Sequence, residues 1–129
     1  MNDQGGRTEP VVRPAESAPE QVVGAGRETT MQVLVGPDEG AANFVMRRFR
    51  MGAGGGIPRH TNRVEHEQYV LRGRARITVG GEPHDVGPDD TLYIPAGVPH
   101  SYEVLDGPFE FICVVPNAPD RIELSDEGC

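Results

Sequence analysis

The chain has 129 residues, of which 36% are hydrophobic, with 17 glycines, 12 prolines and a formal net charge of −8. This length allows one domain with one modest core, and the acidic balance disfavours nucleic acids and anionic membranes, which are bound by clustered basic residues. All 12 basic residues are arginines, so catalysis through a Schiff-base lysine is excluded.

The first segment, residues 1–27, contains three prolines and scattered valine pairs without a period of 2 or 3.6. It is predicted to be a flexible leader, with Val11–Val12 or 21–23 available to add a strand to a neighbouring subunit. The N-terminus has no apolar stretch typical of a signal peptide, and no part of the chain approaches the roughly 18 apolar residues of a membrane span. The sequence therefore predicts a soluble, cytoplasmic protein without a membrane partner.

Residues 28–117 form the predicted folded domain, because short alternating segments are bounded there by Gly, Pro, Asn or Asp. Eight strands are predicted, at 29–35, 43–51, 67–71, 74–79, 84–86, 91–94, 101–105 and 109–115. A Gly-Gly turn at 80–81 and an Asp-Gly turn at 106–107 are predicted to form hairpins. This pattern favours an all-β sandwich or barrel, followed at 118–129 by a tail or short helical turn.

Three of the four histidines lie at the edges of separate segments. His60 ends the glycine-rich GAGGGIPRH, His66 opens a predicted strand, and His100 closes YIPAGVPH. Neutral imidazole binds Zn, Fe, Mn, Ni and Cu, and an antiparallel barrel can bring residues from different strands to one interior point. A metal site is therefore predicted; the alternative is that each ring lies at the surface or is a satisfied core group. His84 is expected at the surface.

Two spacings resemble the motifs of the cupin superfamily. Residues 54–73, Gly-x5-His-x-Asn-x3-His-x6-Gly, resemble Gly-x5-His-x-His-x3/4-Glu-x6-Gly, and residues 89–100, Asp-x5-Pro-x-Gly-x2-His, resemble Gly-x5-Pro-x-Gly-x2-His-x3-Asn. With the flanking strands the resemblance covers about residues 30–116. It implies a small single-domain cupin, an antiparallel β-barrel also described as a double-stranded β-helix or jelly roll, and a homodimer paired through N-terminal strands.

The departures from these motifs define the expected metal site. Asn62 stands where the usual motif has its second histidine, and His66 stands in place of the glutamate. The resemblance implies His60, His66 and His100 as ligands of one divalent transition metal ion, which is Fe, Mn, Ni, Cu or Zn. Asn62 is either a further weak ligand through its side-chain carbonyl or a residue that contacts the ligands without binding the metal. Asp89 replaces a motif glycine, which is tolerable because Asp accepts a left-handed backbone.

Period-2 alternation indicates which residues line the expected pocket. If His66 faces inward so does Gln68, and if His100 does so does Tyr102. Both polar groups would then lie near the metal, and Tyr102 is a candidate general acid, with Gln68 as a further catalytic or substrate-binding candidate. The alternative is that both simply line the pocket.

In the stretch 44–51, alternation places Arg47 and Phe49 on one face. The cupin resemblance implies that this face points inward, so both are substrate-binding candidates and Arg47 is a candidate clamp for an anion. Alternatively, Arg47 belongs to a solvated face. The predicted core consists of Phe44, Phe49, Ile77, Leu92, Ile94, Phe109, Phe111 and Cys113.

The function expected from the resemblance is that of a metal-dependent enzyme. It would act on a small, chelating, oxygen-rich substrate, dicarbonyl or enolisable, with the metal as a Lewis acid. Dioxygenase chemistry is placed slightly ahead of isomerase, lyase or polyketide cyclase chemistry, because a three-histidine ferrous site resembles that of diketone-cleaving cupin dioxygenases. The alternatives are a non-catalytic module that binds a small molecule or metal, and a metal-free structural cupin.

Overall fold

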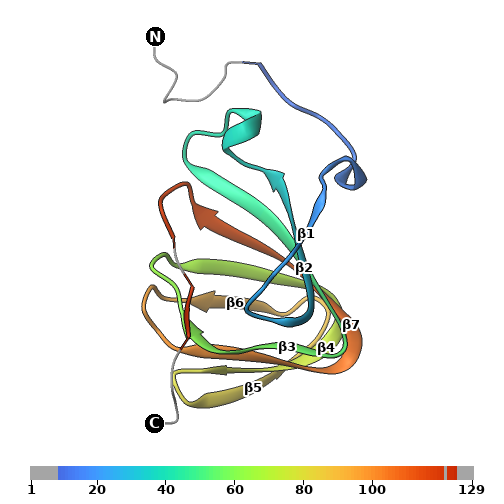
Figure 1. Cartoon of the computed structure of the whole chain (residues 1–129), viewed down its shortest axis with the longest axis vertical. Coiled ribbons are helices and arrows are strands. Elements are labelled where there is room, and N and C mark those ends of the chain that lie inside the picture. The colour runs from blue at the N-terminus through green and yellow to red at the C-terminus, as the bar shows by residue number, and fades with distance from the viewer. Residues whose placement is uncertain (1–8, 121, 125–129) are drawn as a thin grey trace.

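The computed structural model describes residues 9–120 and 122–124, and within them the chain is almost entirely β (Figure 1). Its elements, in chain order, are η2 (Ala15–Ser17), β1 (Glu20–Val22), β2 (Arg27–Val35), η3 (Pro37–Glu39), β3 (Phe44–Thr61), β4 (His66–Val79), β5 (Glu82–Val86), β6 (Thr91–Ile94), β7 (His100–Pro116) and β8 (Glu123–Leu124). The all-β prediction is confirmed. In these described ranges, no helix has the length and hydropathy that crossing a membrane requires.

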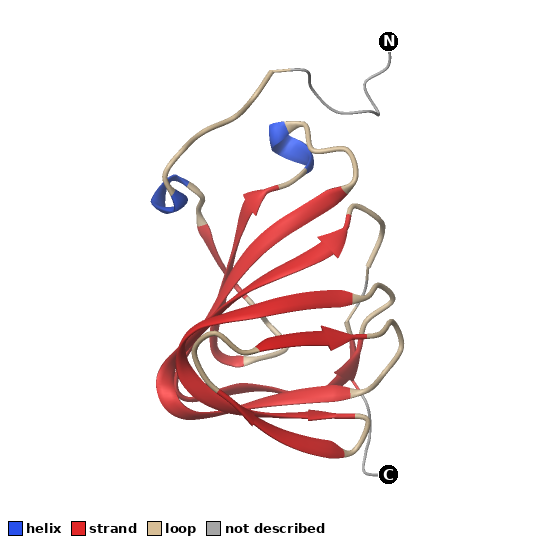
Figure 2. Cartoon of the chain, turned by 180° about the vertical axis from the view of Figure 1, so that it is seen from behind, coloured by secondary structure: helices blue, strands red, loops and turns tan. Residues whose placement is uncertain are grey.

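The strands form one antiparallel sheet with the order β1-β2-β3-β7-β4-β5, in which β6 also pairs with β4 and β8 with β3. The three longest strands, β3, β4 and β7, bend along their length, so that the sheet curls around a shared interior (Figure 2). Strand β7 lies between β3 and β4 along both of its halves. This arrangement brings residues from distant parts of the sequence to one interior point.

The predicted Asp-Gly hairpin at 106–107 is wrong. The chain continues through these residues as the single strand β7, and the predicted strands 67–71 and 74–79 likewise form the single strand β4. Register shifts between β4 and β7 mark the place where the two strands bend together, around Gly73. An Asp-Gly pair favours a local turn, but here long-range pairing of β7 with both neighbours decides the path.

Two other turn predictions agree with the structure. Gly80 and Gly81 have φ values of 59° and 92° and join β4 to β5, with Val79 opposite Glu82, as the predicted hairpin requires. Asp89 has a φ of 73°, the left-handed conformation expected where the cupin motif usually has glycine. The Tyr69 hydroxyl donates a hydrogen bond of 2.6 Å to the Asp89 carboxylate, which helps to hold this turn.

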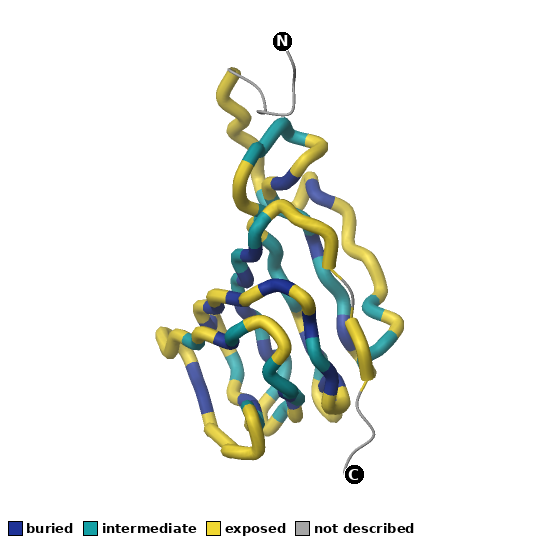
Figure 3. Tube along the Cα trace, turned by 90° about the vertical axis from the view of Figure 1, so that its left-hand side faces the viewer, coloured by how far each residue is buried: buried dark blue, intermediate teal, exposed yellow. Residues whose placement is uncertain are grey.

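The core lies inside the curled sheet, and buried positions alternate along the strands that enclose it (Figure 3). Its largest fully buried apolar side chains are Met51, Val70, Ile77, Ile94, Phe109, Phe111 and Cys113. The prediction of Phe44 as a core residue is wrong, because its side chain is 67% exposed. Phe44 is the first residue of β3 and pairs with Pro116 at the end of β7, where hydrophobicity alone does not ensure burial.

The N-terminal segment differs from the flexible leader predicted for residues 1–27. Strand β1 pairs with β2 of the same chain, and the Arg13 side chain donates a hydrogen bond of 2.9 Å to the Leu34 carbonyl. The Gln32 amide donates to the carbonyls of Ala15 and Ala18, at 3.0 and 2.8 Å. These contacts attach the segment to the sheet from Arg13 onwards; residues 1–8 lie outside the described part.

For residues 118–129 the sequence predicted a tail or a short helical turn, and residues 118–120 and 122–124, which the structure describes, contain no helical turn. Residues 123–124 form β8, which pairs with β3 at His60 and Thr61. Residues 121 and 125–129 lie outside the described part. The tail therefore returns to the sheet beside one of the histidines.

Candidate metal and substrate site

Three histidines converge inside the curled sheet. His60 lies near the end of β3, while His66 and His100 are the first residues of β4 and β7. The His60 and His100 rings are 4.2 Å apart between centroids, and those of His66 and His100 are 5.9 Å apart. All three residues are buried. Pairing of β3 with β7, which sets His60 opposite His100, brings these sequence-distant residues together.

Backbone carbonyls fix the protonation of two of these rings. The Nδ1 atom of His60 is 2.8 Å from the Pro58 carbonyl oxygen, and that of His100 is 2.9 Å from the Val98 carbonyl oxygen. A carbonyl oxygen only accepts, so each Nδ1 carries the proton and each Nε2 keeps its lone pair. Within the described residues, the Nε2 atoms of His66 and His100 are buried without a hydrogen-bond partner. This is the state that metal ligation requires of imidazole.

Burial also keeps the histidines neutral. It lowers the pKa of His66 to about 3, with the nearby positive charge of Arg47 as the next contribution. Burial lowers the pKa of His100 to about 4 and lowers that of His60 as well. At neutral pH the cluster therefore presents uncharged nitrogen donors.

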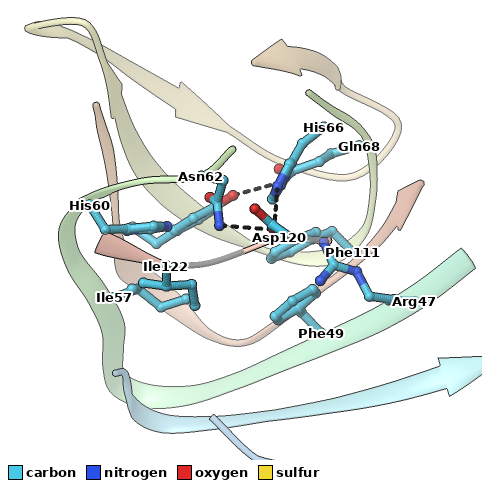
Figure 4. A pocket seen from close by; sticks show the side chains of 11 residues that line it. Arg47, Phe49, Ile57, His60, Asn62, His66, Gln68, Phe111, Asp120 and Ile122 are labelled. Carbon is cyan, nitrogen blue, oxygen red and sulfur yellow. Dashed lines mark hydrogen bonds and ion pairs between the residues drawn. The ribbon is translucent and has the colours of Figure 1, made fainter. Parts of the chain in front are cut away.

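Two of the histidines, His60 and His66, border a small pocket, which the C-terminal residues Asp120 and Ile122 also line (Figure 4). Its free space of about 50 Å³ has room for an ion and a few small ligands. Its wall is polar on one side and apolar on the other. It is lined by Arg47, Phe49, Ile57, His60, Asn62, His66, Gln68, Tyr102, Phe111, Asp120 and Ile122.

Gln68 and Tyr102 form a buried polar pair in this wall. The Gln68 amide nitrogen donates a hydrogen bond of 2.7 Å to the Tyr102 hydroxyl. The Tyr102 ring stacks on Phe111 and meets His100 edge-on, with centroids 5.4 and 5.8 Å apart. Burial raises the pKa of Tyr102, so its hydroxyl stays protonated. Since this hydroxyl accepts from Gln68, its own proton is available for donation to a substrate oxygen.

Arg47 is half-buried and faces the pocket. Its guanidinium lies 5.0 Å from the centre of the Phe49 ring and donates to the Cys113 sulfur at 3.3 Å. Among the ion pairs formed by the described residues, none involves Arg47. The structure thus places this arginine where an anionic group in the pocket would meet it.

A family model described as "Cupin domain" matches residues 47–115, more than half of the chain. The chain belongs to the cupin family. Among solved structures, this cupin is similar to the polyketide cyclase RemF from Streptomyces resistomycificus, with a TM-score of 0.82 and 27% identity over 93% of this chain and 89% of that one. A search of curated proteins found no match.

Two further solved structures resemble this cupin. One is a cupin-2 domain from Rhodospirillum rubrum, with a TM-score of 0.72 and 27% identity over 85% of this chain and 74% of that chain. The other is KdgF from Halomonas sp., with a TM-score of 0.74 over 86% of this chain and 96% of that chain. Its identity is 13%, so this second likeness shows the fold alone.

Two of the side chains that depart from the usual cupin motif, Asn62 and His66, lie at the same pocket. The Asn62 amide nitrogen donates a 3.3 Å hydrogen bond to Asp120, and its buried oxygen has no hydrogen-bond partner in the described ranges. The His66 Nδ1 atom lies 3.5 Å from the Cys113 sulfur. Cys113, expected only as a core residue, therefore also helps to orient a histidine. His84 is exposed on β5.

Within residues 9–120 and 122–124, no group of three or more His, Cys, Asp or Glu side chains has the arrangement of a metal centre. The metal site expected for this cupin stays a prediction. Sequence reasoning also missed Asp120 and Ile122 as pocket residues. Neither belongs to a motif, and no periodic pattern indicates that the tail returns to the barrel.

Acidification is expected to destabilise the chelator-treated cupin. His66 and His100 have folded pKa values of about 3 and about 4, below the ordinary 6.5, so the unfolded chain binds more protons between these values. Their contribution to the free energy of unfolding is fully present above pH 6.5 and is lost as the pH falls toward 3. As the pH falls from 7 to 5, protonation of each histidine in the unfolded chain is expected to lower the free energy of unfolding by about 2 kcal/mol.

Urea denaturation at pH 7, 6 and 5 measures this dependence. The His66→Gln variant removes one of the two groups and is expected to show a shallower fall. A free energy of unfolding that stays constant over this range in the parent protein would contradict neutral burial of the cluster.

Proposed function

We propose that this cupin is a metal-dependent enzyme that acts on an enolisable carbonyl substrate, with His60, His66 and His100 as metal ligands. The observation that carries the proposal is the buried cluster of neutral rings, in which the Nε2 atoms of His66 and His100 have no partner among the described residues. A buried nitrogen without a partner is destabilising, and a bound cation removes that cost.

The donor set fits a divalent ion of Fe, Mn, Ni, Cu or Zn, because imidazole nitrogen suits each of these metals. When bound, such an ion supplies Lewis acidity, which polarises a carbonyl oxygen and makes the neighbouring C–H bond more acidic. Asn62 is either a weak additional ligand through its unpartnered oxygen or a residue that contacts the ligands without binding the metal.

The remaining pocket residues have complementary roles in the proposal. Tyr102 donates its hydroxyl proton to a substrate oxygen on which negative charge develops, and Gln68 holds the hydroxyl in place. Arg47 binds an anionic group of the substrate. The rings of Phe49 and Phe111, stacked 5.1 Å apart, exclude water from one side of the pocket.

Within this class, we favour oxygen-independent cyclisation of a polycarbonyl substrate. The support is the similarity to a polyketide cyclase over most of both chains, at 27% identity. In such a reaction one α-carbon loses a proton and bonds to a second carbonyl carbon of the same molecule, whose oxygen gains a proton. No external oxidant is consumed.

Dioxygenase chemistry is the second candidate. It is favoured by one observation, the replacement of the motif glutamate by His66, which leaves a three-histidine motif set. A dioxygenase requires dioxygen and oxidises its substrate, whereas a cyclase does not, so the two candidates differ in oxygen consumption.

The test combines metal analysis with product analysis. Protein purified without a tag or chelator is expected to contain about one equivalent of metal and to convert a synthetic triketone into its cyclised product under anaerobic conditions. Tyr102→Phe is expected to keep the metal but to slow cyclisation by about 100-fold, the lower end of general acid–base effects. Stoichiometric oxygen uptake with substrate cleavage would instead favour the dioxygenase, and turnover without metal would contradict both candidates.

We also propose that this cupin forms a homodimer. Its substrate is a small molecule, and its location is the cytoplasm. The support for the dimer is the family resemblance together with the position of β1, a strand at one end of the sheet. Val22 in this strand is 84% exposed, and Phe44 in β3 is 67% exposed.

A further inference from the structure

We propose that Asp120 supplies a carboxylate ligand to the metal site and thereby replaces the acidic residue that His66 displaces from the cupin motif. The carboxylate reaches the site on the C-terminal strap, which we define as residues 117–120 together with 122–124. The inference rests on the metal site of the proposed function, and it concerns a residue outside both motifs.

The strap is attached to the sheet on both sides of Asp120. Before it, the backbone N–H of Asn117 donates a hydrogen bond of 2.9 Å to the Asn43 carbonyl. After it, β8 pairs with β3, with Leu124 opposite His60. Asp120 and Ile122 therefore lie over the pocket, and Asp120 points between Asn62 and His66 (Figure 4).

The two oxygens of the Asp120 carboxylate have different surroundings. Oδ1 accepts a hydrogen bond of 2.8 Å from the Arg63 amide, which orients the group. Oδ2 faces the pocket, where the Asn62 side-chain amide donates to it at 3.3 Å and His66 Nε2 lies at 4.0 Å. One oxygen is thus used for positioning, and the other is directed at the histidine cluster.

The contact between Asp120 and His66 is not a direct hydrogen bond. The Oδ2 and Nε2 atoms are 4.0 Å apart, which is too long for one. A hydrogen bond between the two groups therefore does not account for the approach.

The separation does suit two ligands of one ion. With metal–nitrogen and metal–oxygen bonds of about 2.1 Å, two ligands on opposite sides of an ion lie about 4.2 Å apart, and ligands at smaller angles lie closer. The 4.0 Å between Oδ2 and Nε2 is close to the upper end of this range, that of two ligands on nearly opposite sides of the ion. An ion between them would also give the unpartnered His66 Nε2 atom a partner.

Charge supports the same assignment. Three neutral imidazoles leave the full double charge of a divalent ion uncompensated inside the sheet, where charge is costly. The Asp120 carboxylate would neutralise half of it. The competing explanation is that Asp120 only anchors the strap through the Arg63 and Asn62 amides.

The experiment measures the affinity and the visible spectrum of Co²⁺ bound to the full-length chain, by competition with a chromophoric chelator. Asp120→Asn keeps an oxygen for the Arg63 amide but removes the charge. We expect its Co²⁺ affinity to fall by about 10- to 100-fold, the range seen when a residue that supports a metal site is lost, and the ligand-field bands to shift. Glu123→Gln is the matched control, because this exposed strap carboxylate pairs with the Arg63 guanidinium at 3.5 Å; its affinity is expected to stay within twofold.

The outcomes separate this inference from the proposed function. If Asp120→Asn matches the parent protein in both affinity and spectrum while the parent binds one Co²⁺, Asp120 is only an anchor and the proposed function stands. If the parent protein binds no Co²⁺, the proposed function fails and this inference fails with it. Circular dichroism of each variant confirms that the fold is retained.

Discussion

The His100→Ala variant is expected to lose stoichiometric metal binding, with an affinity at least 100-fold below that of the parent protein. His100 is the central member of the cluster, since its ring lies 4.2 Å from that of His60 and 5.9 Å from that of His66. Its Nε2 atom is one of the two buried histidine nitrogens without a partner in the described part of the chain. A structural zinc site binds with about 10–16 kcal/mol shared by four ligands, so one ligand accounts for roughly 3 kcal/mol.

His84→Ala provides the control for this prediction. The His84 side chain is exposed on β5 and belongs to neither cupin motif, so its removal is expected to leave the metal content unchanged. Elemental analysis after dialysis against one equivalent of Zn²⁺ measures both variants. Full retention of metal by His100→Ala, with a native circular dichroism spectrum, would show that this ring is not a ligand.

Much of the site follows from alternation and motif spacing. Period 2 places Gln68 on the same face as His66, and Tyr102 on the same face as His100; all four are buried in the structure. The alternation is informative because one face of each strand is enclosed, so a shift by one residue would expose every one of these groups. Motif spacing likewise indicated that residue 89 adopts a left-handed backbone, and its φ is 73°.

The features that the sequence did not predict depend on long-range contacts. The Asp106–Gly107 pair has the local chemistry of a turn, yet it lies within β7, because both halves of that strand pair with β3 and β4. Phe44 has the composition of a core residue but lies at a strand end. Asp120 is one of several carboxylates in an acidic tail, and only the pairing of β8 with β3 brings it to the pocket.

Gly73→Ala is expected to lower the free energy of unfolding by about 4 kcal/mol or more. Gly73 has a φ of +78° at the point where β4 and β7 bend together. A Cβ atom here would clash with the Pro108 carbonyl oxygen and lie 2.8 Å from the Asp106 carbonyl oxygen. Both neighbours are backbone atoms of β7, and Asp106 pairs with Arg74 of β4 next to Gly73, so neither can give way as the end of a flexible side chain would.

Gly81→Ala separates this close approach from the cost of the backbone conformation alone. Gly81 has a φ of +92°, and a Cβ atom there would meet nothing within 4 Å. Its substitution is expected to cost about 1–2 kcal/mol, the penalty of a left-handed backbone for a residue with a side chain. Urea denaturation of both variants gives the comparison. Equal losses would mean that the backbone of β7 can shift at its bend. Gly73, the last glycine of the first cupin motif, would then be required for its φ value and not for the close approach of β7.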